Sequence, residues 1–395
     1  MLINGVPTIG RQAGSRTFGL WNLGFRPFYL LASIFAALSV ALWVCQYAGV
    51  LPFAYVRGPT WHGSEMLFGF VVAVVAGFLF TAVRNWTGRP TPSGPMLAGF
   101  ALLWIAGRIL AATPYLTAAA WVNGAFPVAV AIGVAIPLLA SRNRRNYFFV
   151  ALLAALGVVA VALHLSYFGV LEWPERIGLQ AGLDIVLFIM AVVGGRVIPM
   201  FTNNGVPGTR ARRNPVVEKL ALGGVLLLLV VDIAQPSAGL AVLAAALAIV
   251  HAVRLALWQP WRTLRTPLVW ILHAAYAWIV VHLALRAFAA IDVVPYTIAL
   301  HALTIGGIGG LTIGMMTRTA RGHTGRPLMA DRRDLACYIL VMLAALVRVF
   351  GALAFPGAYL ATVIAAGACW SMAFIVYAIA YAPSLVRARV DGKPG

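Results

Sequence analysis

The chain has 395 residues, of which 62% are hydrophobic and only 10% are charged, and its mean hydropathy is +0.92. Soluble globular proteins carry about a quarter charged residues, so the composition excludes a soluble domain and predicts an integral membrane protein. The formal net charge of +19 is spread over many loops rather than gathered in one patch. It therefore indicates membrane topology and attraction to membrane lipids, and no nucleic-acid partner is expected.

Apolar runs of about 20 residues, each long enough to cross about 30 Å of hydrocarbon, follow one another along the chain. They predict an all-α polytopic membrane protein with twelve transmembrane helices. The expected spans are 28–50, 61–83, 95–113, 117–140, 146–168, 177–200, 217–235, 237–258, 268–289, 294–316, 334–354 and 358–382. We expect a single integral membrane domain over 1–395, with a cytoplasmic N-terminal segment (1–27), a twelve-helix bundle (28–382) and a cytoplasmic tail (383–395).

Most of the 29 Lys and Arg residues lie near the ends of the chain or in every second loop between the expected spans. Cytoplasmic loops of membrane proteins carry such an excess of positive charge. Both termini are therefore expected to be cytoplasmic, and the even number of spans agrees. The opposite loops hold only the isolated arginines Arg57, Arg108, Arg176, Arg286 and Arg348.

The second and tenth spans resemble each other. An offset of 237 residues aligns Gly69 with Gly306 and Gly77 with Gly314, and it places the loop "TGRP" at 87–90 on "TGRP" at 324–327. At roughly half that offset, similar span entrances recur as "RPFYLLA", "RNYFFVA" and "RTPLVWI". Because membrane folds often arise from duplicated units, we predict three four-helix repeats around a pseudo-threefold axis. A 6+6 transporter architecture is the alternative.

Two further patterns bear on a cofactor. Cys45, Cys337 and Cys369 are isolated from one another, so the chain lacks a CxxCH motif and a covalently attached c-type haem is excluded. Glycines recur every fourth residue from Gly306 to Gly314 and form a smooth helix face. Such a face permits close helix packing, or it could accept a flat porphyrin beside His301.

The seven histidines are expected at two levels of the membrane. Ionisable side chains inside a bilayer are costly, so a functional role is their default interpretation, and an interhelical hydrogen bond is the alternative for any one of them. The periplasmic level would hold His62, His164, His282 and His301, and the cytoplasmic level His251, His273 and His323. Neutral imidazole is a ligand of iron, copper and zinc, so two levels favour two sites.

Two carboxylates are expected at the periplasmic level. Glu65 follows His62 by three residues, so both project from one helix face, as a ligand and the group that orients it could. Asp184 lies within the sixth expected span. We predict that both act around the ligands or as a proton relay.

Several stretches spread through nearly the whole chain resemble the NnrS family. They are "FRPFYLLA" (25–32), "WHGSEMLFGF" (61–70), "VRNWTGRP" (83–90), "GGRVIPMFTNNG" (194–205), "PLVWILHAAYAW" (267–278) and "HALTIGGIGGLTIGMMTRTARGHTGRPL" (301–328). The resemblance implies a multi-pass protein of the bacterial inner membrane that contains haem and copper. It also implies a role in denitrification and in tolerance of nitric oxide and nitrosative stress.

The family's histidine positions carry over residue by residue to this chain. They correspond to His62, His164, His251, His273, His301 and His323. His282 lies outside these motifs and is the weaker ligand candidate. The family usually reads WHxHE, whereas this chain reads "WHGSE" at 61–65, with Ser64 in place of the second histidine. Because a hydroxyl is a poor replacement for imidazole on copper, Ser64 puts the copper content of this chain in question.

With the resemblance, the favoured function is binding or redox chemistry of nitric oxide, or a related small ligand, at one or two histidine-ligated b-type haems beside copper. Four arginines are candidates to pair with haem propionates, with positive-inside anchoring as their alternative role: Arg84, Arg196, Arg321 and Arg326. The catalytic residues, turnover and the electron donor are left open by the sequence. The alternatives are a transporter or channel with an intramembrane His/Asp/Glu relay, and a haem sensor or metal carrier without turnover.

Overall fold

The computed structural model describes residues 18–51, 58–234 and 239–393, and these residues are helical apart from turns, loops and one isolated β-bridge between Phe18 and Arg387. The all-helical prediction is therefore confirmed for this part of the chain. Most of the expected N-terminal segment (1–27), through residue 17, lies outside the described residues, as do Arg57 and the last two residues of the expected tail (383–395).

The helices follow one another with short connections. In the first part of the chain they are α1 (Phe25–Tyr47), α2 (Gly58–Ser64), η1 (Glu65–Val71), α3 (Val72–Thr87), α4 (Gly94–Leu110), α5 (Leu116–Ala140), η2 (Arg144–Asn146) and α6 (Phe148–Tyr167). The middle part holds α7 (Glu175–Gly205), α8 (Pro215–Ala234), α9 (Leu240–Leu257), η3 (Pro260–Arg262) and α10 (Pro267–Ala289). The last part holds α11 (Tyr296–His301), η4 (Ala302–Gly309), α12 (Gly310–His323), α13 (Arg332–Leu346), η5 (Val347–Gly351), α14 (Ala352–Ala354), η6 (Pro356–Ala358) and α15 (Tyr359–Val386).

Ten helices among the described residues are long and apolar enough to cross a membrane, so the chain is a multi-pass membrane protein. Two more of the twelve expected spans are present as helices but fall short of that description. The helix α4 has only 17 residues, which gives a length of about 26 Å. The helix α8 has 20 residues but carries Glu218, Lys219 and Asp232. The count of twelve spans remains a prediction.

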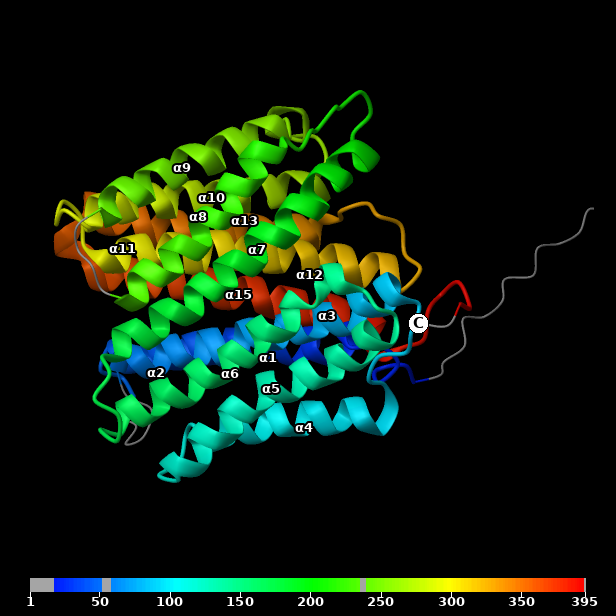
Figure 1. The fold of residues 1–395 in the computed structure, drawn as a ribbon, viewed down its shortest axis with the longest axis horizontal. Coiled ribbons are helices and arrows are strands. Elements are labelled where there is room, and N and C mark those ends of the chain that lie inside the picture. The colour runs from blue at the N-terminus through cyan, green and yellow to red at the C-terminus, as the bar shows by residue number, and fades with distance from the viewer. Residues whose placement is uncertain (1–17, 52–57, 235–238, 394–395) are drawn as a thin grey trace, which may run out of the picture.

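The helices form one bundle in which distant parts of the chain are neighbours (Figure 1). The helix α5 packs on α6, α9 packs on α10, and α15 packs on α1. Buried Arg26, at the start of α1, donates hydrogen bonds to the carbonyls of Ser384 and Leu385 at 3.3 and 3.0 Å. These contacts hold the described N- and C-terminal residues together at one end of the bundle, here named the terminal end. The opposite end, with α2 and α11, is named the far end.

Three π-helical segments interrupt α-helices of the bundle near the far end. The segment η1 begins directly after Ser64, η4 begins directly after His301, and η5 contains Arg348. A π-helical turn widens the helix, re-aims its side chains, and is frequent at functional sites. The segments η1 and η4 also occupy the positions that the 237-residue offset aligns, so the backbone matches where the residues match.

The glycine face of the tenth expected span packs against α10. A Cβ on Gly306 would lie 2.2 Å from Trp278, one on Gly310 would lie 2.6 Å from Ala275, and one on Gly314 would lie 2.9 Å from Leu272. Close helix packing is therefore the role of these glycines, and the alternative of a porphyrin lying on this face is wrong. Side chains of α10 occupy that space.

Gly306→Ala is expected to lower the free energy of unfolding by about 1–3 kcal/mol, because the added methyl group overlaps the largely buried Trp278 ring. The matched control is Gly223→Ala in α8, where a Cβ meets nothing within 4 Å; this change is expected to be neutral or mildly stabilising. Unfolding in mixed detergent micelles measures both. Equal effects of the two substitutions would contradict the packing argument.

Candidate functional site

The histidines lie at the two levels that the sequence predicts. Those near the far end are His62, His164, His282 and His301, and those near the terminal end are His251, His273 and His323. Among the described residues no group of three His, Cys, Asp or Glu side chains could hold a metal ion. The far-end histidines divide among three separate surroundings, and those near the terminal end also have different partners.

His62 and His301 are the two histidines that the structure brings together. They come from α2 and α11 and are close enough to interact electrostatically. The His62 ring stacks on Trp43 of α1 at 5.1 Å between centroids and 10° between planes. The guanidinium of Arg348 interacts electrostatically with both imidazoles. This group is named the far-end histidine pair.

The proton on His301 can be assigned from its partner. The Nδ1 atom lies 2.5 Å from the carbonyl oxygen of Thr297, and because a carbonyl can only accept, Nδ1 must carry the proton. The Nε2 atom of a neutral ring then keeps its lone pair. The same reasoning holds for His164, whose Nδ1 donates to Ala160 at 2.8 Å, and for His282, whose Nδ1 donates to Ala299 at 2.7 Å. A backbone carbonyl on Nδ1 is the arrangement that commonly prepares Nε2 to bind a metal.

Arg348 is a buried cation that lacks an anionic partner among the described residues. Its side chain is only 7% exposed. The NH2 group donates to the hydroxyl of Tyr359 at 2.6 Å, but NH1 is buried without a hydrogen-bond partner. Burying an unpaired charge is costly. The far-end histidine pair therefore lies beside a positive group suited to an anion.

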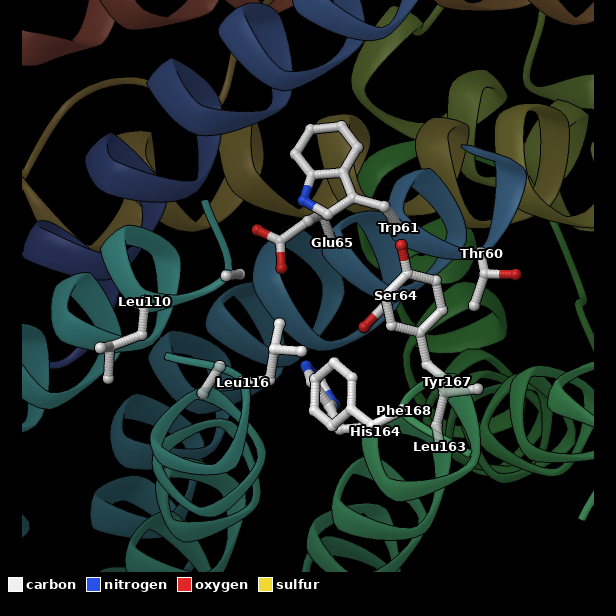
Figure 2. A pocket seen from close by; sticks show the side chains of 12 residues that line it. Thr60, Trp61, Ser64, Glu65, Leu110, Leu116, Leu163, His164, Tyr167 and Phe168 are labelled. Carbon is white, nitrogen blue, oxygen red and sulfur yellow. The ribbon is translucent and has the colours of Figure 1, made fainter. Parts of the chain in front are cut away.

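His164 lines a separate small pocket of about 40 Å³ with Ser64 and Glu65 (Figure 2). The Nε2 atom of His164 lies 3.5 Å from the side-chain nitrogen of Asn123, and the hydroxyl of Ser64 is buried without a partner. One water molecule needs about 10–15 Å³ of such cavity volume, so the pocket has room for a few water-sized molecules. It is far smaller than the roughly 300–1,000 Å³ of pockets for larger ligands.

Glu65 belongs to this pocket. It accepts a hydrogen bond from Arg108 at 2.7 Å, and its side chain is 2% exposed. The second amino group of Arg108 donates to Asn123. Although His62 and Glu65 are three residues apart, His62 stacks on Trp43, and the two side chains have different neighbours. The role of Glu65 beside a ligand or in a proton relay stays a prediction.

Asp184 lies in a second far-end cluster. Its Oδ1 accepts from Gln180 at 2.7 Å and from Arg286 at 3.4 Å. Arg286 also pairs with Asp232 of α8, and the side chains of Asp184 and Arg286 are 0% and 3% exposed. Thus an intramembrane acid that the sequence singled out lies beside a second acid and a cation.

Near the terminal end, Arg254 forms a buried bidentate ion pair with Glu218. Its Nε and NH2 atoms donate to the two oxygens of Glu218 at 2.8 Å each, and NH1 donates to the hydroxyl of Tyr276 at 2.7 Å. A Cβ on Gly195 would lie 1.9 Å from Arg254 NH2. The "GGR" stretch therefore lets α7 pass directly over the guanidinium.

His251 completes this network rather than offering a free lone pair. The hydroxyl of Tyr276 accepts from Arg254, so its own proton is directed to His251 Nδ1 at 2.7 Å. The Nε2 atom of the neutral ring must then carry the proton. It is buried and directed toward the backbone of Ala221. In this arrangement His251 is a structural residue.

The other two terminal-end histidines differ from it. The hydroxyl of Thr202 donates to the Ile198 carbonyl, so it must accept the hydrogen bond from Nε2 of His273 at 2.8 Å. The Nδ1 atom of His273 then keeps its lone pair and is buried without a partner. His323 packs on Phe25 at 5.7 Å, and its carbonyl accepts from Arg389. Two further hydrogen bonds from Arg389 hold the pKa of Asp391 below its usual range. Arg389 thus anchors the chain beside His323.

The predicted propionate partners have varied surroundings. Arg321 directs its guanidinium to Asp334 and Asp331. Arg196 donates to Asn146 at 2.7 Å. Arg84 is half-buried, and Arg326 has a buried NH1 without a partner. Their pairing with a propionate stays a prediction, although Arg321 already has two carboxylate partners.

Sequence reasoning missed the buried arginines near the far end. The assignment of Arg108, Arg286 and Arg348 to loops is wrong and also conflicts with the expected spans 95–113, 268–289 and 334–354, which contain them. All three lie in helices with side chains that are 9%, 3% and 7% exposed. The carboxylates Glu218 and Asp232 of α8 were also overlooked. The available signal was an isolated charge inside an apolar run, which is costly in a membrane unless it is paired.

Comparison with known proteins gives one result that covers most of the chain. No curated protein matches the sequence. A family model described as NnrS protein matches residues 19–389, which include every helix described above and both histidine levels. The chain therefore belongs to the NnrS family.

Proposed function

We propose that the chain is a haem-binding protein of the NnrS type that responds to nitric oxide, with a b-type haem held by His301 of the far-end histidine pair. One observation carries the proposal. His301 has its Nδ1 proton fixed by Thr297, which leaves Nε2 as a lone-pair donor, and it lies beside His62 and the unpaired Arg348 cation. An imidazole ligand and a buried guanidinium match a haem iron and a haem propionate.

The donor chemistry of these residues fits haem. His301 would hold the iron through its neutral imidazole, whose Nε2 lone pair is free, and His62 beside it has a buried Nδ1 without a partner. The unpaired NH1 group of Arg348 suits a carboxylate. When bound, haem would supply an iron able to bind nitric oxide.

The chain's own residues would hold and orient the group. Thr297 fixes the orientation of the His301 ring, and stacking on Trp43 fixes that of His62. Tyr359 positions the guanidinium of Arg348 through its hydroxyl. The π-helical turn at η4 starts at the residue after His301 and alters the direction of the side chains that follow. Together these residues provide a preorganised site for a ligand with one anionic arm.

Copper fits the far-end histidine pair less well than haem does. His62 and His301 provide two imidazoles, but the described residues offer no group of three ligand side chains, and the neighbouring Arg348 repels a metal cation. Ser64, which stands where the family usually has histidine, lies in the pocket of His164 instead. These residues therefore fit copper poorly, and elemental analysis of the purified protein tests whether copper is bound.

We also propose the finer architecture and location: twelve spans in three four-helix units, in the bacterial inner membrane with cytoplasmic termini. The contacts α5–α6, α9–α10 and α15–α1 support it, because each joins the last helix of one unit to the first helix of the next and so closes a ring. The matched π-helices η1 and η4 support a relationship between the first and third units. The positive-inside distribution supports the orientation.

An absorption spectrum of the protein purified from a haem-producing host tests the function. The expected result is a Soret band, a b-type pyridine haemochrome, iron by elemental analysis, and a band shift when nitric oxide is added to the reduced protein. Absence of both the Soret band and iron from folded protein overturns the haem proposal. A haem spectrum that nitric oxide leaves unchanged overturns the nitric oxide part alone.

A further inference from the structure

A cavity of about 500 Å³ opens at the far end between α7, α8, α10 and α11, away from the far-end histidine pair. The ionisable and polar side chains that line it are Arg176, Gln180, Asp232, Arg286, Asp292 and Tyr296. Most of an apolar membrane bundle offers water no polar partners. This cavity therefore gives water a polar route to Arg286 and Asp232, and through them to Asp184.

Asp184 and Asp232 form a carboxyl pair across Arg286. The NH1 atom of Arg286 lies 3.4 Å from Asp184 Oδ1, and its NH2 atom pairs with Asp232. Gln180 donates to Asp184 at 2.7 Å and accepts from the hydroxyl of Tyr296. Asp184 is 0% exposed and Asp232 is 8% exposed. Arg286, Gln180 and Tyr296 therefore hold the pair in place, and Asp232 lines the cavity.

The number of protons on the pair follows from charge and hydrogen bonding. Asp184 and Asp232 both pair with the single guanidinium of Arg286, and the Oδ2 atom of Asp184 is buried without a hydrogen-bond partner. One guanidinium balances one negative charge, so a second charge would stay uncompensated in a medium of low dielectric constant. A single shared proton makes the cluster neutral.

The other charged groups near the pair do not change the charge count of Asp184, Asp232 and Arg286. On α7, Arg176 lies over the Tyr296 ring at 5.7 Å, and Asp292 is exposed in the loop after α10. These two lining residues carry opposite charges. On α10, His282 interacts with Arg286, but its Nδ1 proton is donated to Ala299. Arg286 occupies the position that a metal cation would need between the two carboxylates.

We propose that Asp184 and Asp232 form a proton-binding site that holds one shared proton and exchanges it with water at the far end through this cavity. The ligand is a proton, delivered by water, and Arg286 sets the charge balance that retains it. Tyr296 and Gln180 are positioning residues. The site is separate from the far-end histidine pair, so it does not depend on haem.

Infrared difference spectroscopy of the purified full chain in H2O and D2O tests the proposal. The wild type is expected to show the C=O stretching band of a protonated carboxylic acid, with a shift to lower frequency in D2O. Asp184→Asn and Asp232→Asn are each expected to lose this band. The matched control Asp292→Asn, at the cavity lining but outside the pair, is expected to retain it.

Two further variants keep the test decisive. Asp184→Glu retains a carboxyl group and is expected to shift the band rather than remove it, which separates loss of the proton from loss of the fold. Ala289→Trp, which fills space at the cavity lining, is expected to keep the band and slow its shift in D2O. The shared proton is overturned if the carboxylic acid band survives in both Asn variants. It is also overturned if the folded wild type shows no such band. If hydrogen–deuterium exchange at the pair is as fast in Ala289→Trp as in the wild type, the water route through the cavity is overturned.

Discussion

His301→Ala is expected to lower the haem content of the purified protein by roughly tenfold or more, since loss of a group that only supports a metal ligand already costs 10–100-fold in metal affinity. The Nε2 atom of His301 is the donor whose availability the structure fixes, through the bond from Nδ1 to Thr297. Alanine removes the ligand and leaves Arg348 and His62 in place. The ratio of Soret absorbance to protein measures the effect.

The control for this experiment is another buried histidine near the terminal end. His251 receives a proton from Tyr276 and carries its own proton on Nε2, so His251→Ala is expected to retain haem while it weakens the network around Arg254. Haem loss in His251→Ala with retention in His301→Ala would reverse the assignment. Imidazole added to His301→Ala should restore part of the band, which distinguishes a missing ligand from a misfolded bundle.

Sequence alone predicted the class of fold because hydropathy reports directly on burial in lipid. It also placed the histidines correctly at two levels, since helix rise converts residue number into depth. Which histidines meet depends on which helices are neighbours. His62 and His301 are far apart in the chain, and only the tertiary packing of the bundle brings both beside Arg348 of η5.

The buried ion pairs likewise depend on which helices are neighbours, which the sequence does not show. The structure places Arg286 and Arg348 inside helices, as the expected spans 268–289 and 334–354 also do, and buries them against partners on other helices. Hydropathy cannot register a partner about a hundred residues away, such as Asp184 for Arg286. The π-helical turns were likewise not predicted, since the sequence signal for helix periodicity does not separate them from α-helix.

Glu218→Gln is expected to lower the free energy of unfolding by about 3 kcal/mol or more, because it leaves a buried charge without its counter-ion. The Arg254 side chain is 1% exposed and directs two hydrogen bonds to Glu218 at 2.8 Å. Glutamine keeps the size of the side chain and can still accept one bond, so the loss reports mainly on charge. The second partner of Glu218, Arg213, is 43% exposed and contributes little.

Lys219→Gln is the matched control, since Lys219 is the exposed neighbour of Glu218 on α8; its effect should stay within about 0.5 kcal/mol. The two substitutions change the net charge by one unit in opposite directions, and unfolding in mixed micelles of native and denaturing detergent compares them. The double variant Glu218→Gln with Arg254→Met should recover part of the lost stability, because a buried pair replaced by apolar groups leaves no unpaired charge. A single Glu218→Gln loss no larger than that of Lys219→Gln would show that Arg254 finds another counter-charge, and the terminal-end network would then not depend on this ion pair.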